Sequence, residues 1–223
     1  MSEVLVNPYR FAGDAAMYSD DFTSYTSGTG GVTWSQDGTQ ITIDGNIPAV
    51  VGDGVDGTVL ERLYKVLPET LDNSKWLCDF NIKYSVIGNA GTEGLQMWFT
   101  STDGEIKETD MDAVGFDTYG QGGAPQRNVR ISSKNGSVDG YGTSFSPALN
   151  TQYYARMIRD DSAFTLTYYN DEERTDPFGA ASLTLVGTIE NMGYVQISSW
   201  VTTGSSQSYE VAALRVYNGV TSI

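Results

Sequence analysis

Histidine is absent from the 223 residues of this chain, and cysteine occurs once, at Cys78. Without histidine the chain cannot form a Ser-His-Asp or Cys-His catalytic group or a histidine-ligated zinc or iron site, and it cannot act as a histidine-dependent polysaccharide lyase. A single cysteine cannot form a disulfide within the chain. Because Cys78 lies in a strand-like apolar run, we predict a buried thiol.

Basic residues are also scarce, since 13 Lys and Arg stand against 28 Asp and Glu, for a net charge of -15. This charge repels nucleic acid and anionic membranes at long range, so we expect no nucleic-acid partner. No apolar run approaches the ~20 residues that span a bilayer, which predicts no membrane insertion. The first residues, MSEVLVNPYRFAG, lack the basic start and apolar core of a secretory signal.

The chain is rich in tyrosine and glycine, with 14 Tyr and 25 Gly, and 12% of its residues are aromatic. This composition favours a β-rich globule with many turns. Nothing in the middle of the sequence resembles a linker, so we predict one domain over residues 20–223, preceded by an N-terminal arm over residues 1–19. Only residues 183–192 show any helical period, and that window is too short and too β-branched for a helix.

Residues 151–170, TQYYARMIRDDSAFTLTYYN, predict a β-hairpin. One face alternates apolar residues on both sides of an Asp-Asp-Ser turn. The other face carries Tyr154, Arg156, Thr165, Thr167 and Tyr169, a polar and aromatic mixture that suits a wet or ligand-facing surface.

Similar alternation predicts further strands, roughly ten to fourteen in all, enough for two packed sheets. We expect a loop over residues 46–57 and a hairpin that turns at Asp37 and Gly38. The fold class is therefore all-β, a two-sheet antiparallel jelly-roll β-sandwich. The other predicted strands are residues 58–66, 75–85, 94–100, 114–118, 128–133, 193–201 and 208–217.

Five segments occur in an order that resembles the concanavalin A-like lectin and glucanase superfamily. The resemblance covers residues 20–219 and implies the jelly-roll sandwich of that superfamily. It is similar to the non-catalytic modules found on microbial and viral surface proteins. The segments are DDFTSY, KWLCDFNI, GLQMWFTS, the hairpin TQYYARMIRDDSAFTLTYYND and the closing YEVAALRVYNG.

The glucanases of this fold place two or three carboxylates on alternate positions of one strand, and no strand here has that pattern. The acids of residues 104–112 and 170–176 lie in polar loops, which are typical of solvated surface. We therefore predict no catalytic residues. A glycoside hydrolase is an open alternative, because pairing of residues 75–85 with 208–217 would set Asp79 and Glu210 side by side.

Carbohydrate binding needs an aromatic platform and planar hydrogen-bonding groups. The hairpin supplies Tyr154, Arg156 and Tyr169, and we expect Trp98 and Trp200 to join them if their strands share that sheet. The alternative is that these aromatic residues pack against a loop or a neighbouring subunit.

Three further side chains have structural interpretations. We assign Trp34 and Trp76 to the core, and Arg130 to an ion pair on the sheet.

No cofactor or metal is predicted, although calcium is an alternative because related lectins often bind it in acidic loops. Asp110 and Asp112, or Asp53 and Asp56, could supply hard oxygen ligands, but neither pair has EF-hand spacing.

The sequence thus predicts a non-catalytic, lectin-like recognition module that binds a glycan or a cell-surface polysaccharide. We expect it to act in adhesion, as part of a virion or at an extracellular surface. A second hypothesis is a purely structural capsid or tail component. In that case the apolar arm and the surface tyrosines would contact virion proteins or further copies of the chain.

Overall fold

The computed structural model describes residues 16–25, 34–38, 41–44, 49–55, 61–87, 93–104, 106, 110–121, 126–199 and 207–223. Across these residues the chain forms fifteen β-strands and no helix. No helix within this part of the chain is long and apolar enough to cross a membrane. The all-β prediction is confirmed.

The strands pair into two antiparallel sheets. The eight-stranded sheet has the order β13-β12-β11-β6-β15-β4-β3, with β1 also paired to β15, and the seven-stranded sheet has the order β10-β9-β8-β7-β14-β5-β2. The bounds of the first set are β1 Tyr18–Asp20, β3 Ile41–Asp44, β4 Ala49–Val55, β6 Lys75–Val86, β11 Gln152–Asp160, β12 Ala163–Tyr169, β13 Pro177–Thr184 and β15 Gln207–Asn218. Those of the second set are β2 Ser35–Asp37, β5 Glu61–Val66, β7 Glu93–Thr100, β8 Ala113–Gln121, β9 Gln126–Asn135, β10 Val138–Phe145 and β14 Tyr194–Ser199.

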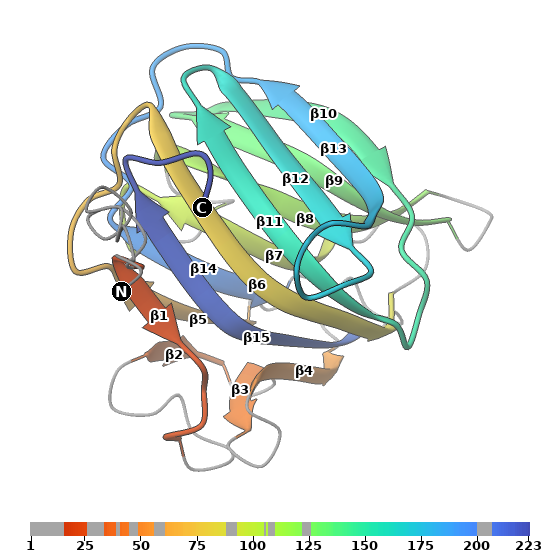
Figure 1. Ribbon diagram of the computed structural model, residues 1–223. Helices are drawn as coiled ribbons and strands as arrows, with labels where there is room; N and C mark the ends of the chain where they lie inside the picture. The colour runs from red at the N-terminus through yellow and green to blue at the C-terminus, as the bar shows by residue number, and fades with distance from the viewer. Residues whose placement is uncertain are drawn as a thin grey trace, which may run out of the picture.

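The two sheets lie face to face, with the eight-stranded sheet in front of the seven-stranded sheet in Figure 1. Consecutive strands often change sheet, as from β5 to β6 and from β6 to β7. This arrangement confirms the predicted two-sheet antiparallel sandwich.

The core fills the space between the sheets because inward and outward side chains alternate along each strand. In β6 every second side chain from Trp76 to Tyr84 was predicted to point inward, and each of them is fully buried, including the Cys78 thiol. The β11–β12 hairpin has the predicted faces, since Tyr153, Ala155 and Met157 are buried. Trp34 also lies in the core, as expected.

Two sequence-based predictions about the N-terminal third are wrong. The hairpin predicted around Asp37 does not form, because β2 pairs with β5 in one sheet while β3 pairs with β4 in the other. The predicted loop at residues 46–57 contains the strand β4, which pairs with β15. Its glycines suggested a loop, but backbone pairing with two neighbours makes it a strand.

The strand β1 overlaps the end of the predicted N-terminal arm. It begins at Tyr18, so the last two residues of the predicted 1–19 arm pair with β15. Residues 1–15 of that arm lie outside the described residues. The strand β15 bends between its pairing with β4 and with β1, and Ala213 has a φ of 51° there.

Candidate functional site

The structure brings three of the five predicted binding residues together. Tyr154 and Tyr169 are opposite each other in the β11–β12 register, and Arg156 is two residues along β11 on the same outer face. All three side chains are half-buried. The hairpin therefore presents the predicted mixture of phenol and guanidinium groups.

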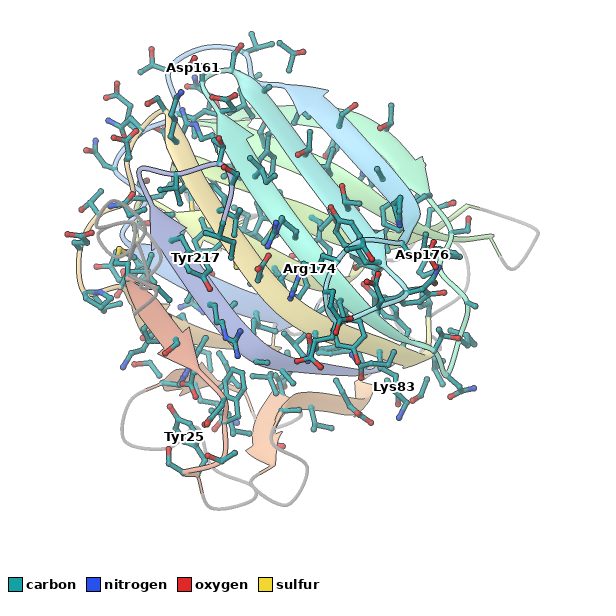
Figure 2. The ribbon with its side chains drawn as sticks, viewed as in Figure 1. Tyr25, Lys83, Asp161, Arg174, Asp176 and Tyr217 are labelled. Carbon is teal, nitrogen blue, oxygen red and sulfur yellow. The ribbon has the colours of Figure 1, made fainter. Side chains whose placement is uncertain are left out.

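Arg156 is engaged within the protein. Its Nε and Nη2 donate to the two carboxylate oxygens of Asp79 at 2.7 and 2.8 Å, and the Arg174 Nε lies 3.4 Å from the same carboxylate. Asp79 is only 3% exposed as a result. Arg174 reaches the sheet from the loop at residues 170–176, in front of β6 and β11 in Figure 2. The centre of this face is therefore an internal ion-pair network.

The loop at residues 170–176 is shaped by Asp171, whose carboxylate accepts hydrogen bonds from the backbone N–H groups of Thr175 and Asp176 and from the Thr175 hydroxyl. The Thr175 side-chain bond and these backbone bonds lower the pKa of Asp171 below its ordinary value. We expect a carboxyl-detected NMR titration to find this pKa below that of Asp171 in an unfolded peptide. Since the folded pKa is depressed, the contribution to stability is present above the unfolded pKa and is lost as pH falls through the folded pKa. An Asp171 pKa equal to that of the peptide would contradict the observed hydrogen bonds.

Of the two predicted tryptophans, Trp98 does not join the hairpin. Trp98 lies on β7, in the other sheet, and is 6% exposed because Ile106, Met111 and Ala113 pack over it. Trp200 lies outside the described residues. Trp98 was expected to extend the hairpin surface only if its strand belonged to the same sheet, and it does not.

The two strand-borne acids of the glucanase alternative are also apart. The strands β6 and β15 do pair, but the register sets Glu210 opposite Lys83 and Asp79 opposite Arg215. Asp79 is four residues from Lys83 along β6, about 13 Å at the rise of a strand. The partner of Glu210 is therefore Lys83, whose Nζ lies 3.2 Å from the Glu210 carboxylate. The expectation that pairing would place these carboxylates side by side is wrong.

One of the acidic loop candidates for calcium, Asp112, has other partners. Asp112 accepts hydrogen bonds from the backbone N–H groups of Gly136 and Glu190, which ties three loops together. Within the described residues no group of three or more acidic, cysteine or histidine side chains could hold a metal ion. The Asp53 side chain and Asp56 lie outside the described part of the chain.

A row of polar side chains crosses the outer face of the seven-stranded sheet, perpendicular to its strands. Successive registers place its members opposite one another on six neighbouring strands, from β5 to β10. The polar row consists of Arg62, Ser198, Gln96, Asp117, Arg130 and Ser144. Four of the six are nearly buried, and the row becomes exposed only toward Ser144 on the edge strand β10.

The exposed end of the polar row is built around Arg130. Its guanidinium lies between two tyrosine rings, 4.5 Å from the centroid of Tyr119 and 4.0 Å from that of Tyr141. Its Nη2 donates to Asp117 at 3.1 Å, and the buried Ser132 hydroxyl donates to the same carboxylate at 2.6 Å. The ion pair predicted for Arg130 is confirmed. Tyr141 remains 53% exposed, so this tyrosine–arginine stack presents an aromatic surface on a fixed support.

Sequence reasoning missed the tyrosine–arginine stack for two reasons. The strand β10, which carries Tyr141, was not predicted, because its residues VDGYGTSF contain two glycines and only two large apolar or aromatic groups besides valine. The alternation of Asp117 and Tyr119 in β8 is visible in the sequence. The register that places Arg130 between the two tyrosines is not, since it depends on which strands are neighbours.

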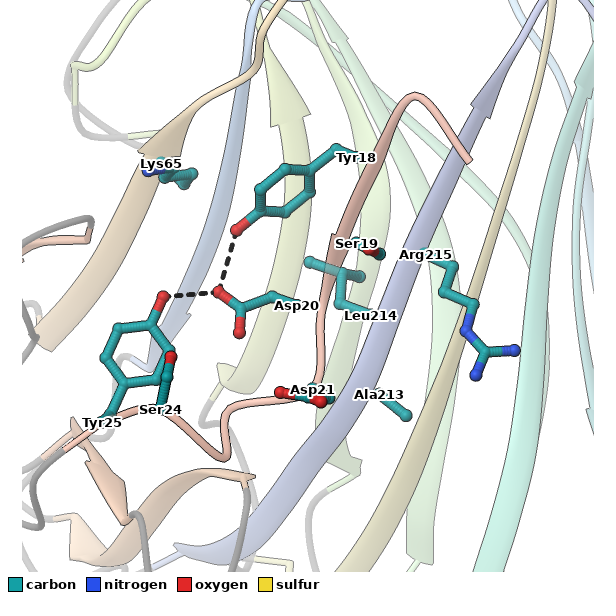
Figure 3. Close-up of a pocket in the computed structure, with 10 residues that line it drawn as sticks. All are labelled: Tyr18, Ser19, Asp20, Asp21, Ser24, Tyr25, Lys65, Ala213, Leu214 and Arg215. Atoms are coloured by element: carbon teal, nitrogen blue, oxygen red, sulfur yellow. Dashed lines mark hydrogen bonds between the residues drawn. The ribbon is translucent and has the colours of Figure 1, made fainter. Parts of the chain in front are cut away.

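A separate pocket of about 470 Å³ lies beside β1, where β15 bends. Figure 3 shows that the Asp20 carboxylate is its organising group, because the hydroxyls of Tyr18 and Tyr25 both donate to it, at 3.0 and 2.6 Å. Trp34 Nε1 donates to the same oxygen at 2.9 Å. Burial and the charge of Asp20 raise the pKa of Tyr18 well above its ordinary value. These bonds saturate Asp20, so we assign it to positioning the N-terminal strand.

Solved structures identify the fold. The VIP36 exoplasmic/lumenal domain in its Ca²⁺/Man2-bound form superposes with a TM-score of 0.60 at 12% identity, covering 93% of this chain and 90% of that one. The Emp47p carbohydrate recognition domain gives 0.61 at 11% identity, over 92% and 97% of the two chains. The legume lectin-like domain from Entamoeba histolytica gives 0.58 at 12% identity, over 83% and 90%. The chain has the concanavalin A-like lectin fold.

The likeness to this lectin fold is structural and spans most of each chain. No protein-family model matches the sequence, and no curated protein matches it either. The five-segment resemblance found in the sequence is confirmed at the level of the fold. At 10–12% identity the superposition transfers no individual residue role, so a binding site must be argued from this chain's own side chains.

Proposed function

We propose that this chain is a non-catalytic carbohydrate-binding module whose glycan site is the tyrosine–arginine stack of Tyr119, Arg130 and Tyr141. The observation that carries the proposal is the exposed Tyr141 ring, which is fixed by Arg130. A pyranose can stack on such a ring with little loss of side-chain entropy. Ser144 and Asp139, also on β10, supply polar groups for the sugar hydroxyls.

Two observations support this choice of face over the hairpin face of Tyr154, Arg156 and Tyr169. On the hairpin face, the central guanidinium donates to Asp79 and is covered by the loop at residues 170–176. On the seven-stranded sheet, the aromatic ring of Tyr141 is more than half exposed, and Asp117, the partner of its supporting arginine, is buried. The lectin fold of VIP36, which was solved with Ca²⁺ and Man2, supports the ligand class.

The absence of catalysis is part of the proposal. Retaining glycosidases hold two carboxylates about 5 Å apart and inverting ones about 6.5–9.5 Å apart. In the polar row the only carboxylate is Asp117, which is engaged by Arg130 and Ser132. The Asp79 and Glu210 carboxylates are each paired with a cation and are separated along the sheet.

A glycan array, run with and without calcium, followed by calorimetry on the best ligand, tests the proposal. We expect Tyr141→Ala to weaken binding at least tenfold and Tyr141→Phe to retain it, because stacking uses the ring. Tyr169→Ala, on the hairpin face, is the matched control and should bind as the wild type does. The reverse pattern would move the site to the hairpin face, and the absence of any glycan ligand would remove the proposed function.

The setting of this activity stays a prediction. It is an extracellular or virion surface, with a homo-oligomer or a purely structural role as further possibilities. Contacts with virion partners are predicted through the arm at residues 1–19, of which 1–15 lie outside the described residues. Calcium dependence is tested by the paired arrays.

A further inference from the structure

An arginine occupies a core-facing position at one end of the sandwich. Arg159 follows Tyr153, Ala155 and Met157 in the inward row of β11 and is only 6% exposed. Its register partners are Trp76 on β6 and Phe164 on β12, both fully buried. The guanidinium therefore lies where the other strands place apolar groups.

Arg159 has no ion pair with any carboxylate in the described part of the chain. Its Nε donates to the backbone carbonyl oxygen of Asp161 at 3.3 Å, and its buried Nη1 has no hydrogen-bond partner. By contrast, the half-buried Arg130 and Arg156 each pair with an aspartate. Burying an ionised group without a partner is strongly unfavourable, and burial lowers the pKa of Arg159 accordingly. An unpaired buried guanidinium thus points to a missing anionic partner.

A pocket of about 270 Å³ adjoins this arginine, at the end of the molecule marked by Asp161 in Figure 2. Besides Arg159, its lining includes polar side chains that can donate hydrogen bonds: Asn73, Ser162 and Thr188. The volume is several times the ~30 Å³ share of one water molecule, so it admits a small anion with an attached ring.

We propose that this Arg159 pocket binds a small oxyanion group, with the Arg159 guanidinium as its charged partner. The planar fork of N–H donors in a guanidinium matches two oxygen atoms of a carboxylate, sulfate or phosphate. The hydroxyl and amide groups of the lining bind the remaining oxygens. The anion comes either as a free ion or as the acidic group of a sugar, and both present the same oxygens. This site is separate from the tyrosine–arginine stack and does not depend on its function.

Two acids of the lining, the exposed Asp161 and the half-buried Glu190, act against an anion. Their charges, with those of Asp72 and Asp112, act on Arg159 from a distance, but none of the four forms an ion pair with it in the described part of the chain. Because their negative charges repel an anion, Glu190→Gln should strengthen anion binding several-fold. If Glu190 were the true partner of Arg159 in solution, the same substitution would destabilise the protein and create no anion response.

NMR detection of the Arg159 Nε–Hε resonance in the whole chain tests the proposal, with sodium sulfate and sodium glucuronate titrated separately at constant ionic strength. We expect a saturable shift, and an affinity at least tenfold lower by calorimetry in Arg159→Met. Arg215→Met, which removes an exposed arginine and the same charge, is the matched control and should bind as the wild type does. Tighter binding of glucuronate would identify the acidic group of a sugar, and a preference for sulfate would identify a free oxyanion.

Arg159→Lys serves as a second variant if Arg159→Met does not fold, since it retains the charge without the planar fork and should bind several-fold more weakly. The proposal is overturned if neither anion produces a saturable shift of the Arg159 resonance, or if the Arg159 variants bind anions as tightly as the wild type does.

Discussion

Replacing Asp79 with alanine is expected to lower the free energy of unfolding by about 3–5 kcal/mol, the range observed when one partner of a buried ion pair is removed. Asp79 is 3% exposed and is the shared partner of Arg156 and Arg174. Without its carboxylate, two guanidiniums with side-chain exposures of 18% and 13% lose the only carboxylate that pairs with them in the described part of the chain. Urea unfolding followed by circular dichroism at pH 7 measures the loss.

The control for this substitution lies on the same face of the same sheet. Among the residues that the structure describes, Glu210 pairs with Lys83 alone, and their side chains are 27% and 33% exposed. Solvent screens this pair, so Glu210→Ala should cost about 0–1 kcal/mol. Equal, small losses for both variants would show that water solvates Arg156 and Arg174 when Asp79 is absent, and that the network is not a structural element.

Most of the fold follows from local pattern. In β6, β11 and β12 apolar groups recur at every second position, so the core-facing side of each strand can be assigned before any partner is known. The strand β13 cannot be predicted in this way, because its residues PFGAASLT show little apolar alternation and few of its side chains are buried. Such edge strands form through backbone pairing with a neighbour, here β12.

The strands β2 and β3 show the second limit. A turn residue pair between two short strands is the usual sign of a hairpin, and Asp37-Gly38 supplies it, but the chain crosses to the other sheet at this point. Ser35–Asp37 pairs with β5, and Gly38 packs so closely on Glu61 that an added Cβ would overlap the carboxylate. The position of a jelly-roll crossover depends on both sheets and has no local signature.

The residue types of the candidate site could be predicted from the sequence, but its position on the sandwich could not. The chemistry of an aromatic ring beside an arginine was visible in the hairpin, yet β11 sets Arg156 opposite Asp79 and thereby engages its donors. The stack of Tyr119, Arg130 and Tyr141 draws on three strands. Only their register brings the rings to both sides of one guanidinium, and register is a property of the assembled sheet.

The second large effect is expected at the centre of the sandwich, where Phe80 of β6 and Phe116 of β8 stack across the gap between the sheets. Their ring centroids are 5.7 Å apart with an interplanar angle of 3°, and both side chains are fully buried. Phe80→Ala should therefore cost about 3–5 kcal/mol, through lost transfer free energy and the cavity left behind. Val138→Ala, at a side chain that is 65% exposed, should change stability by no more than about 0.5 kcal/mol.

A double-mutant cycle separates the contact between the rings from burial alone. Each single alanine variant removes the stack, so the double variant should cost less than the sum of the two by about 0.5–1.5 kcal/mol, the coupling of an aromatic pair. The measurement is urea unfolding of the wild type, Phe80→Ala, Phe116→Ala and the double variant. Because Phe80 belongs to one sheet and Phe116 to the other, this coupling measures how far direct contact joins the two layers. Strict additivity would show that the layers are held by burial without a specific contact at this point.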